Sequence, residues 1–334
     1  MRMILALALL AAAFTCEAAP QSLDIYFIDV EGGQSTLLVT PQRQTFLIDT
    51  GFAGHAQRIV AAARDAGVGK IDYLMITHFH ADHDGSVAEL SKLLSIQHFI
   101  DHASLLPEAQ KDTGTREAFE RYVAVRNGHP HIVPKPGDRI PLAGVDVEVV
   151  SSAASVLGQP LRGTGKTNAQ CGAAAVPPRD TLENPRSTGV VVTWGKFRFL
   201  DVGDLSGQPL FDLACPKSLI GPVDVYLVAH HGGPDVADPA LFAAFSPRVA
   251  IMNNGLTKGG AKTTYESLHH VSGLADVWQV HKSQAAGEQN FADDYIANLD
   301  ESTSHWIELS AHADGSFQVV NGRTGQIKAY PARD

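Results

Sequence analysis

Eight consecutive residues, 77–84, carry three histidines and two aspartates. They directly follow an apolar run, residues 71–76, that indicates a buried strand. A strand that ends in such a turn brings several imidazole and carboxylate groups together, and these are the groups that Zn²⁺ and similar ions prefer. A polar loop that contains histidines by chance is the alternative, and the density of ligands argues against it. The sequence therefore predicts a metal site that includes His78, His80, Asp82 and His83.

Two later apolar segments, 197–202 and 223–228, also end in groups that bind metals. Asp204 follows the first segment, and His230 and His231 follow the second. Asp204 could instead cap a helix, and a histidine pair could lie on the surface. Their place after buried strands favours a metal site. We expect His78 and His80 to bind one ion, Asp82 and His83 to bind a second, Asp204 to bridge the two, and His230 or His231 to complete the second.

Two ions about 3.5–4 Å apart, bridged by a carboxylate and a hydroxide, form the site of many hydrolases. The bound hydroxide attacks a carbonyl or phosphoryl centre, and the ions stabilise the oxyanion that develops. We expect Asp82 and His231 to take part directly in catalysis, and Asp49 and Asp84 to orient imidazoles. Further polar residues at predicted strand ends are expected to line the pocket, namely His102, Asn253 and His281.

The elements that must position these residues form two similar halves. The first has strands near 23–30, 36–39 and 45–48, then helices over 55–66, 85–94 and 108–126 with strands over 71–76 and 97–100 between them. The second has strands over 189–194, 197–202, 223–228, 249–252 and 277–280 with short helices between, and a final hairpin near 305–320. This pattern predicts an α/β fold, a four-layer αββα sandwich with the polar residues along one edge.

Residues 153–185 are rich in Gly, Pro, Ala, Thr and Asn and have no clear period, which predicts a long insertion that shapes specificity. Cys171 lies within it, and Cys215 follows the next predicted hairpin. In an oxidising compartment two such cysteines are candidates for a disulfide. Two free thiols, or one thiol that binds a metal, are the alternatives.

The first residues resemble an export signal. Arg2 precedes an apolar stretch over residues 4–14, and small residues follow, so we predict a signal peptide over 1–18 with cleavage after Ala18 or Ala19. Cys16 raises the alternative of a lipoprotein. Residues 19–334 are then expected to form one secreted or periplasmic hydrolase domain without a membrane span. The formal net charge of −10 argues against nucleic acid as a partner, and the oligomeric state stays open.

Several motifs resemble those of the metallo-β-lactamase superfamily. Residues 78–83 (HFHADH) are similar to its HxHxDH signature, 46–51 (FLIDTG) to its first motif, 199–204 (FLDVGD) to its bridging-aspartate strand and 229–232 (AHHG) to its last ligand motif. The resemblance implies the αββα fold. Residues 28–35 (IDVEGGQS) and the double histidine bring the chain closer to the hydrolase domain of competence DNA-uptake (ComEC-type) proteins and to phosphorylcholine esterases.

The chain departs from the β-lactamase pattern at Asn184, which stands where those enzymes have a third metal histidine. The resemblance then implies that His78 and His80 hold their ion with one protein ligand fewer, unless His102 or a water takes the place.

We predict a secreted hydrolase with two divalent ions, most simply zinc, that uses a metal-bound hydroxide on a phosphodiester or phosphoester. Lys258, Lys262 and Arg186 are candidate cations for phosphate. The alternatives are a lactonase, thioesterase or β-lactamase-type acyl hydrolase, and a protein whose metal is structural.

Overall fold

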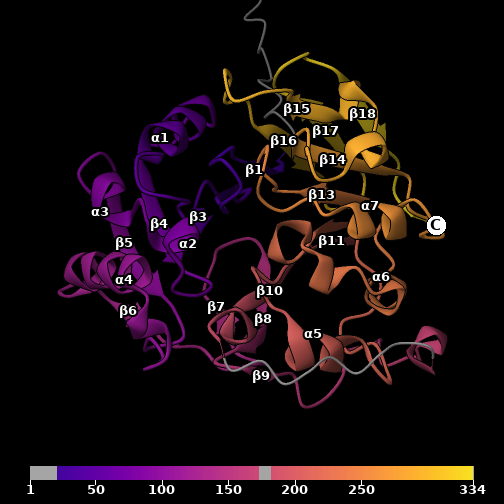
Figure 1. Ribbon diagram of the computed structural model, residues 1–334, viewed down its shortest axis with the longest axis horizontal. Helices are drawn as coiled ribbons and strands as arrows, with labels where there is room; N and C mark the ends of the chain where they lie inside the picture. Colours follow the sequence, from indigo (N-terminus) through magenta and orange to yellow (C-terminus); the bar gives the residue numbers. More distant parts are fainter. Residues whose placement is uncertain (1–20, 173–181, 334) are drawn as a thin grey trace, which may run out of the picture.

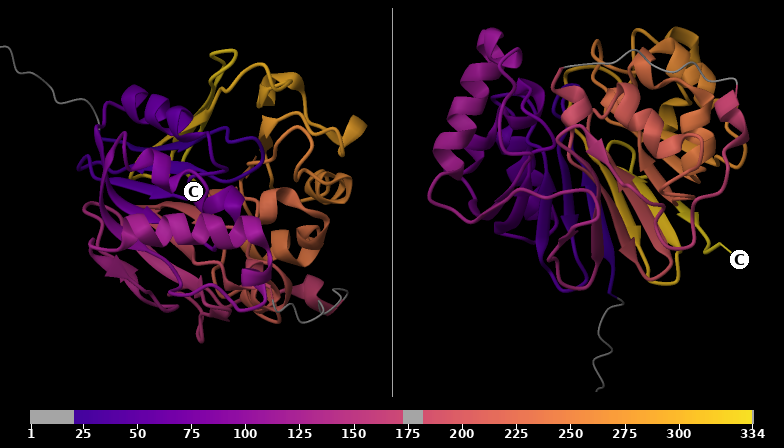
Figure 2. Two further views of the ribbon diagram at one scale, coloured as in Figure 1. Left: turned by 60° about the vertical axis from the view of Figure 1, so that its left-hand side comes forward. Right: turned by 90° about the horizontal axis from the view of Figure 1, so that it is seen from below.

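The computed structural model describes residues 21–172 and 182–333. The predicted signal peptide and residues 173–181 of the predicted insertion lie outside the described residues. Two β-sheets pack face to face, and helices cover the outer face of each, as the view from below in Figure 2 shows. The predicted αββα sandwich is therefore confirmed.

The first sheet has nine strands in the order β18-β17-β16-β1-β2-β3-β4-β5-β6. Strands β3 to β6 are parallel, whereas β18 to β3 pair antiparallel. The predicted final hairpin corresponds to β16 and β17, and one further strand, β18, pairs with β17. The strands are β1 (Leu23–Phe27), β2 (Thr36–Val39), β3 (Thr45–Ile48), β4 (Lys70–Met75), β5 (Ser95–Ile100), β6 (His131–Ile132), β16 (Ile307–Ala311), β17 (Phe317–Asn321) and β18 (Ile327–Tyr330).

The second sheet repeats this plan in the order β15-β14-β13-β12-β11-β10-β8-β7, with β9 paired to β8. Strands β11 to β15 are parallel, and the pairs from β7 to β11 are antiparallel. The strands are β7 (Arg139–Ile140), β8 (Asp146–Ser152), β9 (Ser155–Val156), β10 (Gly189–Trp194), β11 (Phe197–Asp201), β12 (Val225–Leu227), β13 (Val249–Met252), β14 (Asp276–His281) and β15 (Ile296–Asn298).

The helices lie on the two outer faces (Figure 1). The first sheet carries α1 (Ala56–Asp65), α2 (Ala81–Asp84), α3 (Val87–Leu90) and α4 (Thr113–Arg126), and the second carries α5 (Gly207–Ala214), α6 (Pro239–Phe245) and α7 (Lys262–Leu268). Single 3-10 turns are η1 (Ala109–Lys111), η2 (Ala169–Gly172), η3 (Asn184–Arg186), η4 (His230–Gly232), η5 (Pro234–Val236), η6 (Gly287–Gln289) and η7 (Asp293–Tyr295).

Two predicted helices have different bounds. The helix expected over 85–94 begins earlier, because the carbonyl of His80 already accepts hydrogen bonds from the amides of His83 and Asp84, and it divides into α2 and α3. The helix expected over 108–126 is a 3-10 turn followed by α4. Asp112 separates the two, since its side chain accepts a hydrogen bond from the amide of Thr115 and caps α4.

Three apolar layers follow from the alternation of side chains along the strands. On β10, Val190 and Val192 enter the core between the sheets, while Val191 enters the core beneath the helices of the second sheet. Phe27 and Phe199 meet edge to face across the two sheets with ring centres 5.7 Å apart. A third core lies between the first sheet and its helices. These layers fix both sheets, so their strand ends can hold side chains in place.

The predicted insertion contains short elements rather than a wholly irregular loop. It includes β9, η2 and most of η3. Cys171 in η2 and Cys215 after α5 form a disulfide with Cα atoms 5.7 Å apart, which confirms the predicted pairing. Within residues 21–172 and 182–333, no helix is both long and apolar enough to cross a membrane.

Asp101 joins β5 to its neighbours. Its buried carboxylate accepts hydrogen bonds from Tyr122 and Arg126 of α4 and lies 2.9 Å from the His131 ring nitrogen of β6. Burial alone would raise the pKa of Asp101, but the contacts with His131, Tyr122 and Arg126 outweigh it and lower that pKa to about 2.

A group whose pKa falls on folding stabilises the protein above its unfolded pKa, and the contribution disappears as the pH falls through the folded value. We expect Asp101→Asn to cost about 2 kcal/mol of unfolding free energy above pH 4, and the cost to shrink as the pH approaches 2. Urea unfolding of both proteins at several pH values measures it. Asp65→Asn, on the exposed face of α1, is the control. A cost that does not change with pH would contradict this account.

Candidate metal centre

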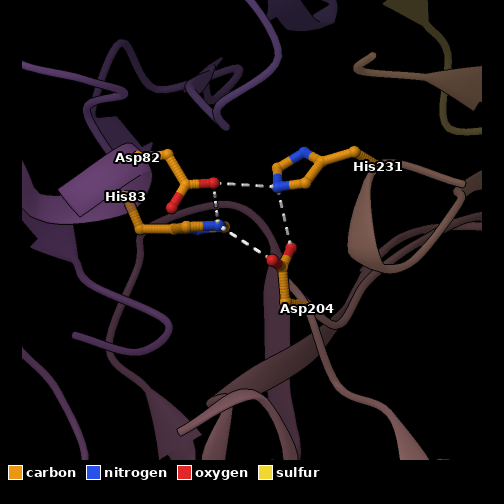
Figure 3. A group of neighbouring side chains, drawn as sticks. All are labelled: Asp82, His83, Asp204 and His231. Atoms are coloured by element: carbon orange, nitrogen blue, oxygen red, sulfur yellow. Dashed lines mark ion pairs between the residues drawn. The ribbon is translucent and has the colours of Figure 1, made fainter. Parts of the chain in front are cut away.

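Four buried side chains from the two halves of the fold converge on one point (Figure 3). Asp82 and His83 come from α2, Asp204 follows β11 and His231 follows β12. One ligand atom from each lies within 4.8 Å of the others. His231 Nε2 is 3.2 Å from Asp82 Oδ2 and 3.2 Å from Asp204 Oδ1, and His83 Nε2 is 3.2 Å from Asp204 Oδ2. The cluster therefore spans both sheets at their carboxyl ends, where open α/β sheets commonly bind ligands.

The backbone at His230 and His231 is left-handed, with φ of 49° and 50°. This conformation is costly for a residue with a side chain, and the surroundings must enforce it. The amide of Gly260 donates to the carbonyl of His231, and Gly259 passes so close that a Cβ there would lie 2.4 Å from that oxygen. The loop after β13 thus holds the histidine pair, and glycine is required at residue 259.

Asp49, at the end of β3, orients His83. Its Oδ2 lies 2.7 Å from His83 Nδ1, and the carboxylate also accepts hydrogen bonds from the amide and hydroxyl of Thr77, each 2.7 Å long. Asp49 itself has a left-handed backbone, with φ of 61°. With Nδ1 held in this way, Nε2 of His83 faces Asp204, which is how carboxylates commonly orient metal-binding imidazoles.

The charges of the cluster are tightly coupled. Burial alone would lower the pKa of His83, but Asp204, Asp82 and Asp49 outweigh it and raise the pKa well above its usual value. Burial would raise the pKa of Asp204, yet His231 and His83 hold it well below the usual range. Both carboxylates of the cluster are therefore ionised at neutral pH, as metal binding requires.

A second group of imidazoles lies beside the cluster. His78 Nε2 is 2.9 Å from His80 Nδ1 and 3.9 Å from Asp204 Oδ2, and His230 Nε2 is 3.8 Å from the same oxygen. Burial lowers the pKa of His78 well below its usual value, and the neighbouring His83 and His80 lower it further. The pKa of His80 is lowered mainly by burial. His78 and His80 are therefore neutral imidazoles near this carboxylate, which suits a second cation. Burial alone would lower the pKa of His230, but Asp235 and Asp204 outweigh it and raise that pKa.

His230 is oriented from outside by Asp235, a residue that the sequence did not single out. The Nδ1 of His230 lies 2.8 Å from Asp235 Oδ2, so it donates its proton there and leaves Nε2 as the free lone pair. That nitrogen lies 3.1 Å from Nδ2 of Asn184. The structure thus brings Asn184 to the site and turns His230 and His231 toward different parts of it, although the sequence suggested that only one would face the ions.

His102 and Asp84 are buried near these imidazoles but outside the four-residue cluster. His102 packs on Phe79 with ring centres 4.3 Å apart, and its Nε2 lies 3.1 Å from Oε2 of the buried Glu183, which sequence reasoning missed. Both carboxylate oxygens of Asp84 lack a hydrogen-bond partner among the described residues, and burial raises its pKa well above the usual value. Neither is seen to orient an imidazole of the cluster.

Within the described residues, the side chains of Asn253 and His281 contact groups other than the predicted ligands. Asn253 Nδ2 donates to Oε1 of Gln34, whose own amide donates to Asp201. His281 Nε2 lies 2.8 Å from Asp29 and forms a separate group with Asp29, Glu31 and Arg58. In that group Arg58 forms ion pairs with both carboxylates. The expectation that His281 lines the same pocket is not supported by these contacts.

Of the three candidate cations, Lys258 is the one that contacts the cluster. Its ammonium pairs with Asp82 and donates to the carbonyl of Gly32 over 2.9 Å. Lys262 pairs with Glu266 within α7, and the nearest charged partner of Arg186 is Glu183.

The donor set fits divalent cations. Three buried cluster atoms, His83 Nε2, Asp204 Oδ1 and His231 Nε2, make no hydrogen bond with a described residue, although each lies 3.2 Å from an oppositely charged atom of the cluster. Leaving such atoms unpaired costs free energy, and a cation between them would satisfy all three. Imidazole and carboxylate ligands suit zinc and its neighbours among the transition metals.

The chain is similar to known proteins of one superfamily. The family model described as Metallo-beta-lactamase superfamily matches residues 29–158, which include α2 and the histidine loop but not Asp204 or His231. The comparison with curated protein sequences finds no match.

Several solved structures are also similar to parts of the chain. A metallo-β-lactamase with a HARLDQ motif from Cronobacter sakazakii is 21% identical, with a TM-score of 0.35, and the match covers 55% of this chain and 60% of that chain. The metallo-β-lactamase fold protein YhfI from Bacillus subtilis is 11% identical, with a TM-score of 0.48 and coverage of 78% and 96%. CmlA, a diiron β-hydroxylase from Streptomyces venezuelae, is 15% identical, with a TM-score of 0.43 and coverage of 72% and 46%.

Asp49→Asn keeps the shape of the Asp49 side chain but removes the charge that holds His83. We expect it to weaken binding of Zn²⁺ about 10- to 100-fold, as loss of such orienting carboxylates typically does. Competition with a chelating dye measures the affinity.

Asp72→Asn is the matched control, because Asp72 accepts hydrogen bonds from Thr45 across the same strands, β3 and β4, near the opposite end. It should lower stability and leave zinc affinity unchanged. Equal affinity in both variants would show that Asp49 does not orient a ligand.

Proposed function

We propose that this chain is a metal-dependent hydrolase of the metallo-β-lactamase superfamily that acts on a phosphodiester or a phosphoester. The observation that carries the proposal is the convergence of Asp82, His83, Asp204 and His231, each with one ligand atom within 4.8 Å of the others, although several of these buried atoms make no hydrogen bond with a described residue. These four residues would hold one divalent ion. His78, His80 and His230 would hold the other, and Asp204 would lie between the two.

This assignment supplies the third imidazole for the first ion. His230 Nε2 and His78 Nε2 lie at nearly equal distances from Asp204 Oδ2, 3.8 and 3.9 Å. Asp235 fixes the tautomer of His230 as Asp49 fixes that of His83. His230 thus compensates for the absence of a histidine at residue 184, and His102 is not needed as a ligand.

Bound divalent ions would lower the pKa of a coordinated water toward neutrality and offer positive charge to a developing oxyanion. The residues of the chain supply a hydrogen-bond acceptor for the water and exclude bulk solvent from the site. Asp82 stays ionised at neutral pH, because His83 and His231 outweigh the effect of its burial on its pKa, so its carboxylate is available both to an ion and to a hydrogen bond from a nearby water. Burial of the surrounding imidazoles keeps bulk solvent away and strengthens these interactions.

The anionic substrate is supported by Lys258. Its side chain is 39% exposed, so its ammonium lies at the cluster and within reach of solvent. Divalent ions beside Asp82 would neutralise its charge, so the Lys258 ammonium could pair with a phosphate oxygen instead. The net charge of −10 disfavours a long nucleic acid, so we propose a small phosphoester. Export is supported by the Cys171–Cys215 disulfide, which suits an oxidising compartment.

A screen of the zinc-loaded protein tests the proposal. We expect about two ions per chain and turnover of bis-p-nitrophenyl phosphate or p-nitrophenyl phosphate. Asp82→Ala should reduce the metal content and should reduce turnover by at least about 100-fold. Asp65→Ala is the control and should behave as the wild type. Hydrolysis of a lactone or nitrocefin alone would replace the phosphoester with an acyl substrate. One tightly held ion and no turnover of any substrate would support the alternative that the metal is structural.

Lys258→Met should raise KM for an anionic phosphodiester about tenfold, because a charge-assisted contact to phosphate is lost. Lys262→Met is the matched control, since Lys262 pairs with Glu266 on the exposed side of α7. Steady-state kinetics of both variants and the wild type measure the effect. An unchanged KM in Lys258→Met would rule out a role of that ammonium in substrate binding.

A further inference from the structure

The contact between Asn184 and His230 has a consequence for metal binding. In neutral His230, Nδ1 donates its proton to Asp235, so Nε2 has one lone pair and accepts the hydrogen bond from Asn184 Nδ2 over 3.1 Å. A nitrogen with one lone pair cannot accept this hydrogen bond and bind a metal ion at the same time. Occupation of the first metal site must therefore break the contact with Asn184.

The carboxamide of Asn184 is only half satisfied even before that event. Its Oδ1 is buried and has no hydrogen-bond partner among the described residues. A buried amide without hydrogen-bond partners costs free energy. Loss of the contact with His230 therefore leaves both Oδ1 and Nδ2 of Asn184 without a hydrogen-bond partner.

Asn184 is also held in place by its neighbours. Glu183 Oε1 accepts a hydrogen bond from the amide of Leu106, and Glu183 Oε2 lies beside His102. The other side of this short segment is fixed as well, because the amide of Ser187 donates to the carbonyl of Asn184. The backbone around Asn184 is therefore held by contacts that do not involve His230.

We propose that Asn184 is a substrate-contacting residue that His230 holds in the metal-free protein and releases when the first ion binds. The freed Nδ2 then donates to an anionic oxygen of the substrate, such as a phosphoryl oxygen. This inference rests on the proposed function for the identity of the metal site, and it assigns to Asn184 the recognition of the group that is hydrolysed. Asn184, which stands where the β-lactamases have a third metal histidine, would then bind the substrate rather than a metal ion.

The test compares wild type with Asn184→Ala in two titrations by calorimetry. The first adds Zn²⁺ to the metal-free protein at pH 8, and the first site is identified as the phase that His80→Ala removes. Because a competing hydrogen bond is gone, Asn184→Ala should bind zinc at this site about fivefold more tightly. The second adds inorganic phosphate to the zinc-loaded protein, and Asn184→Ala should bind it about five- to tenfold more weakly.

Asn127→Ala, at the exposed end of α4, is the control and should change neither constant. Asn184→Ser provides a second variant if Asn184→Ala does not fold. Weaker zinc binding in the variants would make Asn184 a metal ligand, and unchanged phosphate binding would remove it from the substrate site; either result overturns the proposal. Absence of turnover by the wild type would instead reject the proposed hydrolase, and the two binding constants would still decide the role of Asn184.

Discussion

The carboxylate of Asp204 joins the two halves of this molecule. It follows β11 of the second sheet, yet its oxygens lie 3.2 Å from His83 of the first half and 3.2 Å from His231 of the second. Two carboxylates and several imidazoles buried this closely are stable only with their charges balanced, so the position of each sheet relative to the other matters for the site. The core between the sheets, where Phe27 meets Phe199, provides that fixed position.

Local strain accompanies this arrangement. Asp49, His230 and His231 all have left-handed backbones, and each lies just after a strand that turns into the site. The carboxylates that orient imidazoles come from outside the cluster, Asp49 for His83 and Asp235 for His230. Packing energy from the sheets thus holds polar groups in conformations that they would not adopt alone, which is common where a site must be preorganised.

Much of this could be predicted from the sequence, because the ligands follow apolar strands. The αββα layers and the loop of residues 77–84 follow from local pattern, and the disulfide of Cys171 with Cys215 is a candidate in the sequence because two cysteines remain after the predicted signal peptide. The contacts that depend on tertiary structure could not be predicted. Glu183 and Asp235 have no local signal, and consecutive histidines give no indication that their left-handed backbone turns them to different parts of the site. The partners of His281, Asp29 and Glu31, also lie about 250 residues away in the chain, so no local pattern indicates them.

The central claim is that His230 and His231 serve different ions on either side of Asp204. X-ray diffraction from zinc-loaded crystals, measured at energies above and below the zinc absorption edge, tests it most directly. We expect two anomalous peaks about 3.5–4 Å apart, one bounded by Asp82, His83 and His231 and the other by His78, His80 and His230. A single peak, or a second peak at the Asp29 and His281 group instead, would contradict it.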